Sequence, residues 1–508
     1  MVGVASDALV PASGPRSHGA RVHPRPYQRC RPWLRSSAAS GLVLTTQKLD
    51  SITSRGTVDA TIEEFVRGLG LDAYLVGGAV RDELLGLESK DADFVVPGVD
   101  YEGLHAALEP HGKVEELEVA GRRVGVRLYP REARLRALAP AGIEFAPPRA
   151  ERSTGPGRHD FEIVADPALS IEDDMGRRDF TVNAMARRLE TGDLVDPFGG
   201  ADDLRRGVLR AVRSRSFAED PLRLVRGLRL VAQLGLEPDA TTLRQMKEDA
   251  ESVRLVSGER VGGGLRADGL GELSKLLLGR QPARALQLAR DTGVLTALLP
   301  EFEPALGLEQ DSARQHLPLD EHIFAVVQGA ADADASLAVR LGALFHDLGK
   351  PASNGDHAEL GAALAAAAMR RLRYPTRLGT HVTELVREHA FPLDGVDELF
   401  ARRFLRTHGD ELAFDLVSLK EADLGGKQVP ASEFDAVAKL RVLLEQERSQ
   451  PHRLADLAVD GADLLELGYA EGPELGHALE SLLDTVIERP DLNTREELLD
   501  RARALRSS

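Results

Sequence analysis

The spacing of hydrophobic positions changes near residue 200. Before it, short apolar runs predict strands, namely YLVGG at 74–78, ADFVV at 92–96 and GIEFA at 142–146. The segment AVRDELLG at 79–86 predicts a helix that its final glycine ends. From about 201 onward the apolar spacing is helical almost throughout, as in DPLRLVRGLRLVAQLG at 220–235. The pattern predicts a mixed α+β head followed by helical domains.

Changes in composition divide the chain further. We expect a disordered leader at 1–48, a head at 49–200, a helical neck at 201–300, a histidine-containing domain at 301–425 and a helical tail at 426–508. The stretch VGGGLRADGLGE at 261–272 predicts a flexible loop. The stretch GYAEGPELG at 468–476 predicts a turn before the helix HALESLLDTVIERP.

Composition excludes several classes of protein. The chain has 508 residues, 43% of them hydrophobic, but no apolar run approaches the roughly 20 residues that span a bilayer. Cys30 is the only cysteine, which excludes a disulfide framework and favours a reducing cytoplasm. Aromatic residues amount to only 4%, which argues against a stacking platform for single strands.

Charge is distributed unevenly. The formal net charge of -17 argues against nonspecific nucleic-acid binding by the whole surface. Residues 121–230, however, hold 21 arginines, no lysine and 17 acidic residues. This middle segment can therefore still offer a basic face to an RNA backbone.

Two aspartates one residue apart follow the first predicted strand–helix unit. Side chains two apart on a strand share a face, so Asp91 and Asp93 can hold two Mg²⁺ ions, and Glu144 can add a carboxylate from a neighbouring strand. The glycines of this unit let backbone amides approach phosphates, and the helix N-terminus favours anions. The phosphate-binding candidates in this unit are Gly77, Gly78, Arg81 and Asp82.

Successive motifs along the first 310 residues identify a family. GGAVRD…KDADF, PPRAER, DDMGRRDFTVNAMA, DPFGG and EDPLRLVRGLRL resemble, in order, the motifs of bacterial tRNA nucleotidyltransferases and poly(A) polymerases. The resemblance implies a polymerase-β-like head that transfers nucleotides to an RNA 3′ hydroxyl. It also implies that Arg178, Asp179 and Asn183, with Arg177 beside them, bind the incoming nucleotide. Without the family, these residues read as a surface ion-pair cluster.

The arginine-rich segment at 219–229 offers a way to choose bases. Asp220 and Arg223 stand three residues apart, and Arg226 and Arg229 continue the row. An acceptor beside a donor complements the pairing edge of cytosine or adenine but not that of guanine or uracil. A helical ion pair is the simpler alternative. In the resembling family this helix is the protein template for adding C, C and A from CTP and ATP.

Histidines and aspartates gather between 322 and 423. Their composition is that of a metal-hydrolase site and resembles an HD-type phosphohydrolase domain, in which a divalent transition metal activates water. Lys350 follows the His-Asp pair, where it can meet a phosphate. The candidate ligands are His322, His346, Asp347, His357, His389 and Asp423.

The leading hypothesis is a cytoplasmic, Mg²⁺-dependent enzyme that builds or repairs the CCA end of tRNA, with an appended phosphohydrolase and a tail that can grip the tRNA. A poly(A) polymerase, or an enzyme that adds only CC or A, shares the same head motifs. A nucleotidyltransferase with an HD domain that modifies a regulatory protein is a third possibility, disfavoured by RRDFTVNA and the arginine-rich helix. A catalytically silent RNA-binding protein is disfavoured by the intact aspartate and histidine sets.

Overall fold

The computed structural model describes residues 58–87, 92–119, 122–153, 161–263, 269–310, 314–353 and 356–507. The expected leader and Cys30 lie outside these residues, as does Asp91. Within the described part, no helix combines the length and the apolar character that crossing a membrane requires.

A seven-stranded sheet, ordered β3-β4-β5-β2-β1-β8-β9, forms the head. The pair β2 and β5 is parallel, and the other neighbours in the sheet are antiparallel. The three strands predicted above are β1, β2 and β5 and are confirmed. The sheet strands are β1 (Tyr74–Val76), β2 (Asp93–Val95), β3 (Gly112–Val119), β4 (Arg122–Pro130), β5 (Ile143–Ala146), β8 (Ala186–Arg188) and β9 (Leu194–Val195). Two further pairs are β6 (Arg149–Ser153) with β7 (Phe161–Ala165) and β10 (Val208–Leu209) with β11 (Glu237–Pro238).

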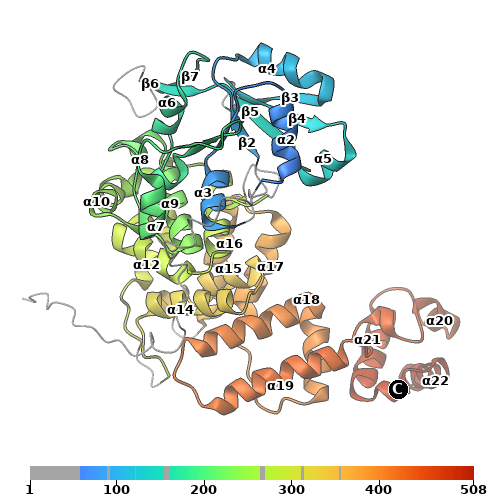
Figure 1. Ribbon diagram of the computed structural model, residues 1–508. Helices are drawn as coiled ribbons and strands as arrows, with labels where there is room; N and C mark the ends of the chain where they lie inside the picture. The colour runs from blue at the N-terminus through green and yellow to red at the C-terminus, as the bar shows by residue number, and fades with distance from the viewer. Residues whose placement is uncertain are drawn as a thin grey trace, which may run out of the picture. The chain divides into compact units, whose positions relative to one another are not determined.

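Alternation of side chains gives this sheet two apolar faces. Leu75, Phe94 and Phe145 join one hydrophobic cluster with residues of α2, α4 and α5, which lie near these strands in Figure 1. Their neighbours Val76 and Val95 join a second cluster with α6 on the opposite face. The head helices are α2 (Ala60–Gly68), α3 (Gly78–Leu85), α4 (Tyr101–Leu108), α5 (Ala133–Leu138) and α6 (Ile171–Gly176).

The predicted helix after β1 is α3, and Gly86 ends it in the left-handed conformation at φ 67°. The arginine-rich segment forms α9 (Leu222–Leu234), which buries Leu224, Val225 and Leu228 in the largest core. The other helices from 200 to 298 are α7 (Gly200–Arg206), α8 (Ser216–Glu219), α10 (Ala240–Asp249), α11 (Glu272–Leu277), α12 (Pro282–Thr292) and α13 (Val294–Leu298).

The remainder of the described chain is helical, as expected. Its core is continuous with that of α9 as far as Leu444, and a separate cluster lies between Val459 and Ala502. The helices are α14 (Leu319–Asp332), α15 (Leu337–Phe345), α16 (His357–Arg371), α17 (Thr376–Glu388), α18 (Glu398–Gly425), α19 (Ala431–Glu447), α20 (Gly461–Glu466), α21 (Pro473–Glu488) and α22 (Arg495–Ser507).

One local prediction is wrong in its bounds and another is wrong at its start, while residues 264–268 of the expected loop lie outside the described part of the chain. The turn at 468–476 is too long, because α21 begins at Pro473, and proline suits the first helical turn, where its missing N–H is not needed. The start of the expected flexible loop is packed instead, since Val261 is buried and Gly262 lies against residue 372. A Cβ on Gly262 would lie 2.6 Å from the Leu372 carbonyl oxygen, so this glycine serves close packing.

Helix α9 carries the arginine row on a core-packed scaffold, so its anchoring can be tested. Leu224 is fully buried, and Leu224→Ala should lower the free energy of unfolding by about 2–5 kcal/mol. Leu255→Ala, at an exposed leucine, should change it by less than about 0.5 kcal/mol. Urea titration of both variants measures the difference, and equal effects would contradict the packing described for α9.

Candidate nucleotide site and candidate metal centre

A cleft of about 690 Å³ opens between the head sheet, α3 and α9. Its volume falls in the range of small-ligand sites. Its lining combines carboxylates with a larger number of arginines. Its charged and polar lining residues include Arg81, Asp82, Asp93, Glu144, Arg149, Arg177, Arg178, Asp179, Asn183, Glu219, Asp220, Arg223, Arg226, Arg229 and Arg260.

The pairing of β2 with β5 places two carboxylates in the cleft wall. Asp93 and Glu144 are direct partners in the parallel register, so their side chains leave the same face of the sheet. Glu144 is also ion-paired with Arg127 of β4. Two adjacent carboxylates provide the hard oxygen ligands that Mg²⁺ takes. The sharing of a face by Asp91 and Asp93 remains a prediction.

Gly77 allows an arginine to approach the turn between β1 and α3. Its φ of 75° and ψ of -131° lie in a region that favours glycine, and a Cβ there would stand 2.5 Å from an Arg178 guanidinium nitrogen. Gly78 opens α3 and lines the cleft with Gly77. Arg81 in the first turn donates to Asp82 Oδ1 at 2.8 Å and to Asn183 Oδ1 at 2.7 Å. The turn therefore brings backbone and guanidinium donors together.

Asp174 lies behind the cleft and contacts three arginines that line it. It is fully buried, forms ion pairs with Arg177 at 2.8 Å and Arg178 at 3.1 Å, and accepts the backbone N–H of Arg149. Burial opposes its ionisation, but these three arginines lower the pKa of Asp174 to about 2. Burial and the charge of Arg177 lower the pKa of Arg149 to about 10. One carboxylate among three cations leaves a positive surplus suited to phosphates.

Asp179 links the head to the arginine helix. Its carboxylate is 5% exposed, accepts from Asn183 Nδ2 at 3.0 Å and pairs with Arg226 at 2.7 Å. Burial raises the pKa of Asp179, but Arg226 and the hydrogen bonds dominate and bring it to about 2. The burial of Asp174 and Asp179 contradicts the alternative of a surface ion-pair cluster. Their network instead fixes arginines at the wall of a cleft.

The predicted base-reading residues all line this cleft. Arg223 is 8% exposed and donates to the Arg177 carbonyl oxygen at 2.8 Å. Arg229 pairs with Glu272 at 3.1 Å. Asp220 precedes α9 in an extended conformation and pairs with Arg260 at 3.0 Å. The simple alternative of an ion pair along one helix therefore does not describe Asp220.

Sequence reasoning missed Arg149 and Arg260 as members of the cleft. Arg149 lies in PPRAER, a motif that supported the resemblance without assigning a residue. Its Nε is buried without a hydrogen-bond partner, as expected for a donor facing an anion site. Arg260 stands 40 residues beyond Asp220, next to the glycine-rich stretch. No local pattern there signals its contact.

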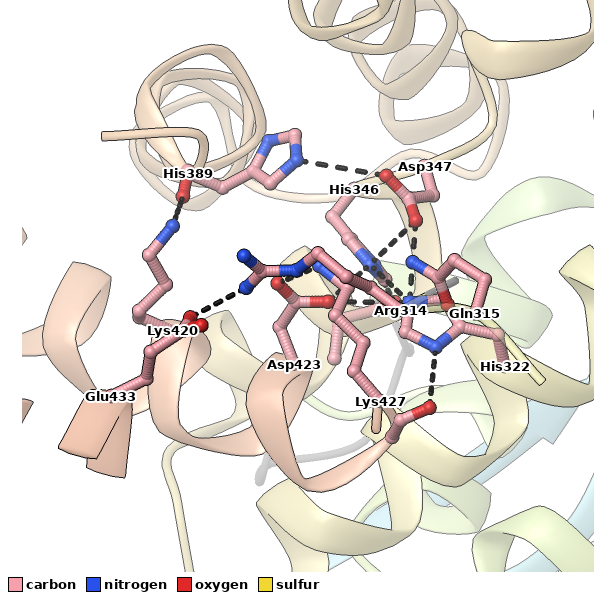
Figure 2. Close-up of polar contacts among 12 residues, drawn as sticks. Arg314, Gln315, His322, His346, Asp347, His389, Lys420, Asp423, Lys427 and Glu433 are labelled. Carbon is pink, nitrogen blue, oxygen red and sulfur yellow. Dashed lines mark hydrogen bonds and ion pairs between the residues drawn. The ribbon is translucent and has the colours of Figure 1, made fainter. Parts of the chain in front are cut away.

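Four buried side chains form the candidate metal centre: one from α14, one from α18 and two from the segment that directly follows α15. His322, His346, Asp347 and Asp423 offer ligand atoms that all lie within 4.8 Å of one another. Figure 2 shows these four side chains pointing toward a common region. Asp423 Oδ1 lies 3.2 Å from His322 Nε2 but is buried without a directed hydrogen bond. Converging donors of this kind suit a transition metal.

Backbone carbonyls orient the imidazole rings. Nδ1 of His322, His346 and His389 lies 3.2, 2.8 and 2.7 Å from the carbonyl oxygens of Gly426, Ala343 and Val386. These contacts favour N–H at Nδ1 and direct the Nε2 lone pairs inward, as metal ligation requires. The Nε2 atoms of His322 and His346 are 3.3 Å apart. Two ring nitrogens at that distance are readily explained by a shared cation.

A second set overlaps the first. Asp347, His357 and His389 also offer ligand atoms within 4.8 Å of one another, so Asp347 belongs to both sets. His389 approaches Asp347 from the side opposite His322 in Figure 2. Lys350 pairs with Asp347 at 2.5 Å, and Lys427 pairs with Asp423 at 2.5 Å. All six predicted ligands thus come together, with lysines beside both aspartates.

Comparison with known proteins matches these two sites to known domains. Residues 73–210 match the poly A polymerase head domain, 235–306 match the probable RNA and SrmB-binding site of polymerase A, and 319–425 match the HD domain. Fold and sites together define a nucleotidyltransferase head with an appended HD domain. The chain belongs to the family of multifunctional CCA proteins, as the relatives below show.

The multifunctional CCA protein of Ralstonia nicotianae is 33% identical over 80% of this chain and 91% of its own length. That of Xanthomonas campestris pv. campestris is 34% identical over 80% of this chain and 96% of its own. The match to the Neisseria gonorrhoeae protein is 40% identical but spans only 62% of that protein and 55% of this chain.

Solved structures share the fold. The Bacillus stearothermophilus CCA-adding enzyme in complex with CTP superposes with a TM-score of 0.61 at 24% identity and covers 88% of this chain and 97% of that one. The Thermotoga maritima CCA-adding enzyme complexed with tRNA gives a TM-score of 0.55 at 20% identity, covering 90% and 98%.

The arginine cluster around Asp174 predicts a pH-dependent contribution to stability. Because the folded pKa of about 2 lies below the ordinary 3.8, ionised Asp174 stabilises the fold above pH 4, and this contribution disappears as pH falls toward 2. Asp174→Asn should cost about 3 kcal/mol at pH 7. The difference from the wild type should shrink by about 2 kcal/mol between pH 4 and pH 2.

Denaturant titrations across this pH range measure that difference. Asp202→Asn, at an exposed ion pair, is the matched control and should change stability by less than about 1 kcal/mol at every pH. A pH-independent gap for Asp174→Asn would contradict the ionised, buried carboxylate.

Proposed function

We propose that this chain is a Mg²⁺-dependent nucleotidyltransferase that adds C, C and A from CTP and ATP to the 3′ end of tRNA. The observation that carries the proposal is the single cleft that joins adjacent carboxylates, buried arginines and the Asp220–Arg223 pair. Family membership supports it. A cytoplasmic location is part of the proposal, supported by the proposed tRNA substrate and by the single cysteine.

The carboxylates of the head are the proposed metal ligands. Asp93 and Glu144, with Asp91 from the segment before β2, would hold Mg²⁺. Bound Mg²⁺ supplies activation of the attacking hydroxyl and charge stabilisation of the triphosphate. Arg149, Arg177 and Arg178 then bind phosphate oxygens, for which their surplus positive charge is suited. Backbone amides at Gly77 and Gly78 can approach the same phosphates.

Asp220 and Arg223 are the proposed base readers. Asp220 accepts from the exocyclic amino group of C or A, and Arg223 donates to the adjacent ring nitrogen. Guanine and uracil reverse the donor and acceptor, which leaves the side chains of Asp220 and Arg223 without their hydrogen bonds to the base. Asp179, Asn183 and Arg226 are the proposed contacts of the ribose. The hydrogen bond from Arg226 to Asp179 also fixes α9 against the head. Arg229 extends this positive wall.

A second activity is proposed for the HD domain. Its six converging ligands favour a metal-dependent phosphohydrolase, and the sharing of Asp347 by both sets favours two ions rather than one. Histidine-rich sets select transition metals over Mg²⁺. Bound metal supplies an activated water and charge stabilisation, while Lys350 and Lys427 can hold the phosphate. The proposed boundaries of this domain are 301 and 425, followed by a tail that contacts the tRNA body.

Nucleotide addition is tested with tRNA that ends before CCA, tRNA that ends in CC and an unrelated RNA, each with one labelled nucleotide. We expect C on the first, A on the second and neither on the third. Asp93→Ala should lower incorporation at least about 100-fold, because charge stabilisation worth several kcal/mol is lost. Asp72→Ala, at a half-exposed ion pair with Arg188, is the matched control.

Near-normal incorporation by folded Asp93→Ala would refute the site assignment. Addition of A to the unrelated RNA, without addition of C to either tRNA, would instead identify a poly(A) polymerase.

The HD site is tested by removing two neighbouring ligands, of which Asp347 belongs to both sets. His346→Ala with Asp347→Ala should eliminate bound transition metal and hydrolysis of a 2′,3′-cyclic phosphate, and should spare nucleotide addition. Elemental analysis of the wild type loaded with Mn²⁺, Ni²⁺ or Co²⁺ should find about two ions per chain. His381→Ala, at a histidine paired with Asp415 outside the ligand set, should keep both metal and hydrolysis. A metal-free wild type would make the cluster structural.

A further inference from the structure

The contact between Arg260 and Asp220 brings a distant segment to the proposed base-reading carboxylate. Arg260 lies in the helical turn Glu259–Gly263, and its guanidinium donates to Asp220 Oδ2 at 3.0 Å and to Asp220 Oδ1 at 3.3 Å. Both side chains are partly exposed, at 43% and 32%, and both line the cleft. A two-pronged contact at a cleft wall holds the plane of the carboxylate.

Asp220 needs such a support because of its position. It stands between α8 and α9 with extended backbone angles, so it lies outside both helices. The backbone N–H of Leu222 donates to Oδ1 at 3.2 Å, which fixes one oxygen only. Arg260 contacts both oxygens. Together, Oδ1 accepts two of these hydrogen bonds and Oδ2 accepts one.

The count of contacts identifies the oxygen that can read a base. A carboxylate oxygen accepts about two hydrogen bonds. Among the bonds described above, Oδ1 already accepts from Leu222 and Arg260, whereas Oδ2 accepts from Arg260 alone. An amino group of cytosine or adenine would therefore meet Oδ2. If the carboxylate rotated, Oδ2 would no longer face the amino group of the base, and selection of C and A would weaken.

The segment that carries Arg260 is itself anchored. Val261 is 2% exposed, the Gly262 carbonyl oxygen accepts from Ser274 Oγ at 3.0 Å, and Ser274 Oγ lies 3.1 Å from the Tyr374 hydroxyl. The N–H of Gly263 donates to the Leu372 carbonyl oxygen at 3.3 Å. Arg260 thus extends from a packed base toward the cleft.

We propose that Arg260 is a positioning residue for base selection, which orients Asp220 so that Oδ2 accepts from the incoming base. This inference rests on the proposed function, because it assumes that Asp220 reads C and A. A small neighbouring cavity of about 300 Å³ also borders Glu219, Asp220 and Arg260, so removal of the arginine would open the site on that side. Asp220 could then turn away from the base.

The test measures selection rather than rate. For Arg260→Ala, Arg260→Lys and Asp220→Ala, kcat/KM is determined for CTP and UTP on tRNA that ends before CCA, and for ATP and GTP on tRNA that ends in CC. Arg260→Ala should reduce the CTP/UTP and ATP/GTP ratios at least about 5-fold, as expected for a weakened hydrogen bond to a charged group. Arg260→Lys keeps the positive charge but loses the planar guanidinium that donates to both carboxylate oxygens, so it should give intermediate ratios.

Arg254→Ala is the matched control. Arg254 lies six residues before Arg260, forms an exposed ion pair with Glu251 and does not line the cleft in the described structure. It should leave all four values unchanged. Loss of folded protein in any variant lowers the four values equally and leaves the ratios untouched.

Unchanged ratios for Arg260→Ala, together with reduced ratios for Asp220→Ala, would overturn the role of Arg260 while the proposed function stands. A wild type that does not prefer CTP and ATP would overturn both.

Discussion

The cost of burying an unpaired charge governs the nucleotide site. Asp179 is nearly inaccessible and can remain ionised there only because Arg226 and Asn183 satisfy it. Since Asp179 belongs to the head and Arg226 to α9, this requirement sets the position of the arginine helix against the sheet. Asp174 imposes the same requirement on Arg177 and Arg178. The two buried carboxylates thus hold in place the arginines that line the cleft.

The two proposed metal sites differ in a way that follows from their ligands. The head presents carboxylates from adjacent strands, which is the hard oxygen environment of Mg²⁺. The HD domain presents imidazoles whose Nδ1 atoms face backbone carbonyls, which is an environment for borderline metals. Each site is therefore suited to a different ion. The two proposed reactions would therefore not compete for a single metal.

Much of this architecture could be predicted from local patterns. The strands β1, β2 and β5, the helix α3 with its terminal glycine, and the core face of α9 follow from spacing alone, and the six metal-ligand candidates follow from residue type. Contacts between distant segments could not be predicted in this way. Arg260 meets Asp220 only because the chain folds back, and nothing in the spacing of either segment encodes that return. The start of the loop expected at 261–272 is packed, because glycine permits close approach of backbones as well as conformational freedom.

The contact of Gly262 with Leu372 has a consequence for the independence of the domains. Residues 258–263 rest on backbone atoms of residues 371–374, which belong to the segment matched by the HD domain. The hydrophobic core is also continuous from Phe180 to Leu444. A fragment that ends near residue 300 would lose the support under these glycines and expose apolar surface. We therefore expect a shortened transferase to fold stably only when it retains the helices through α19.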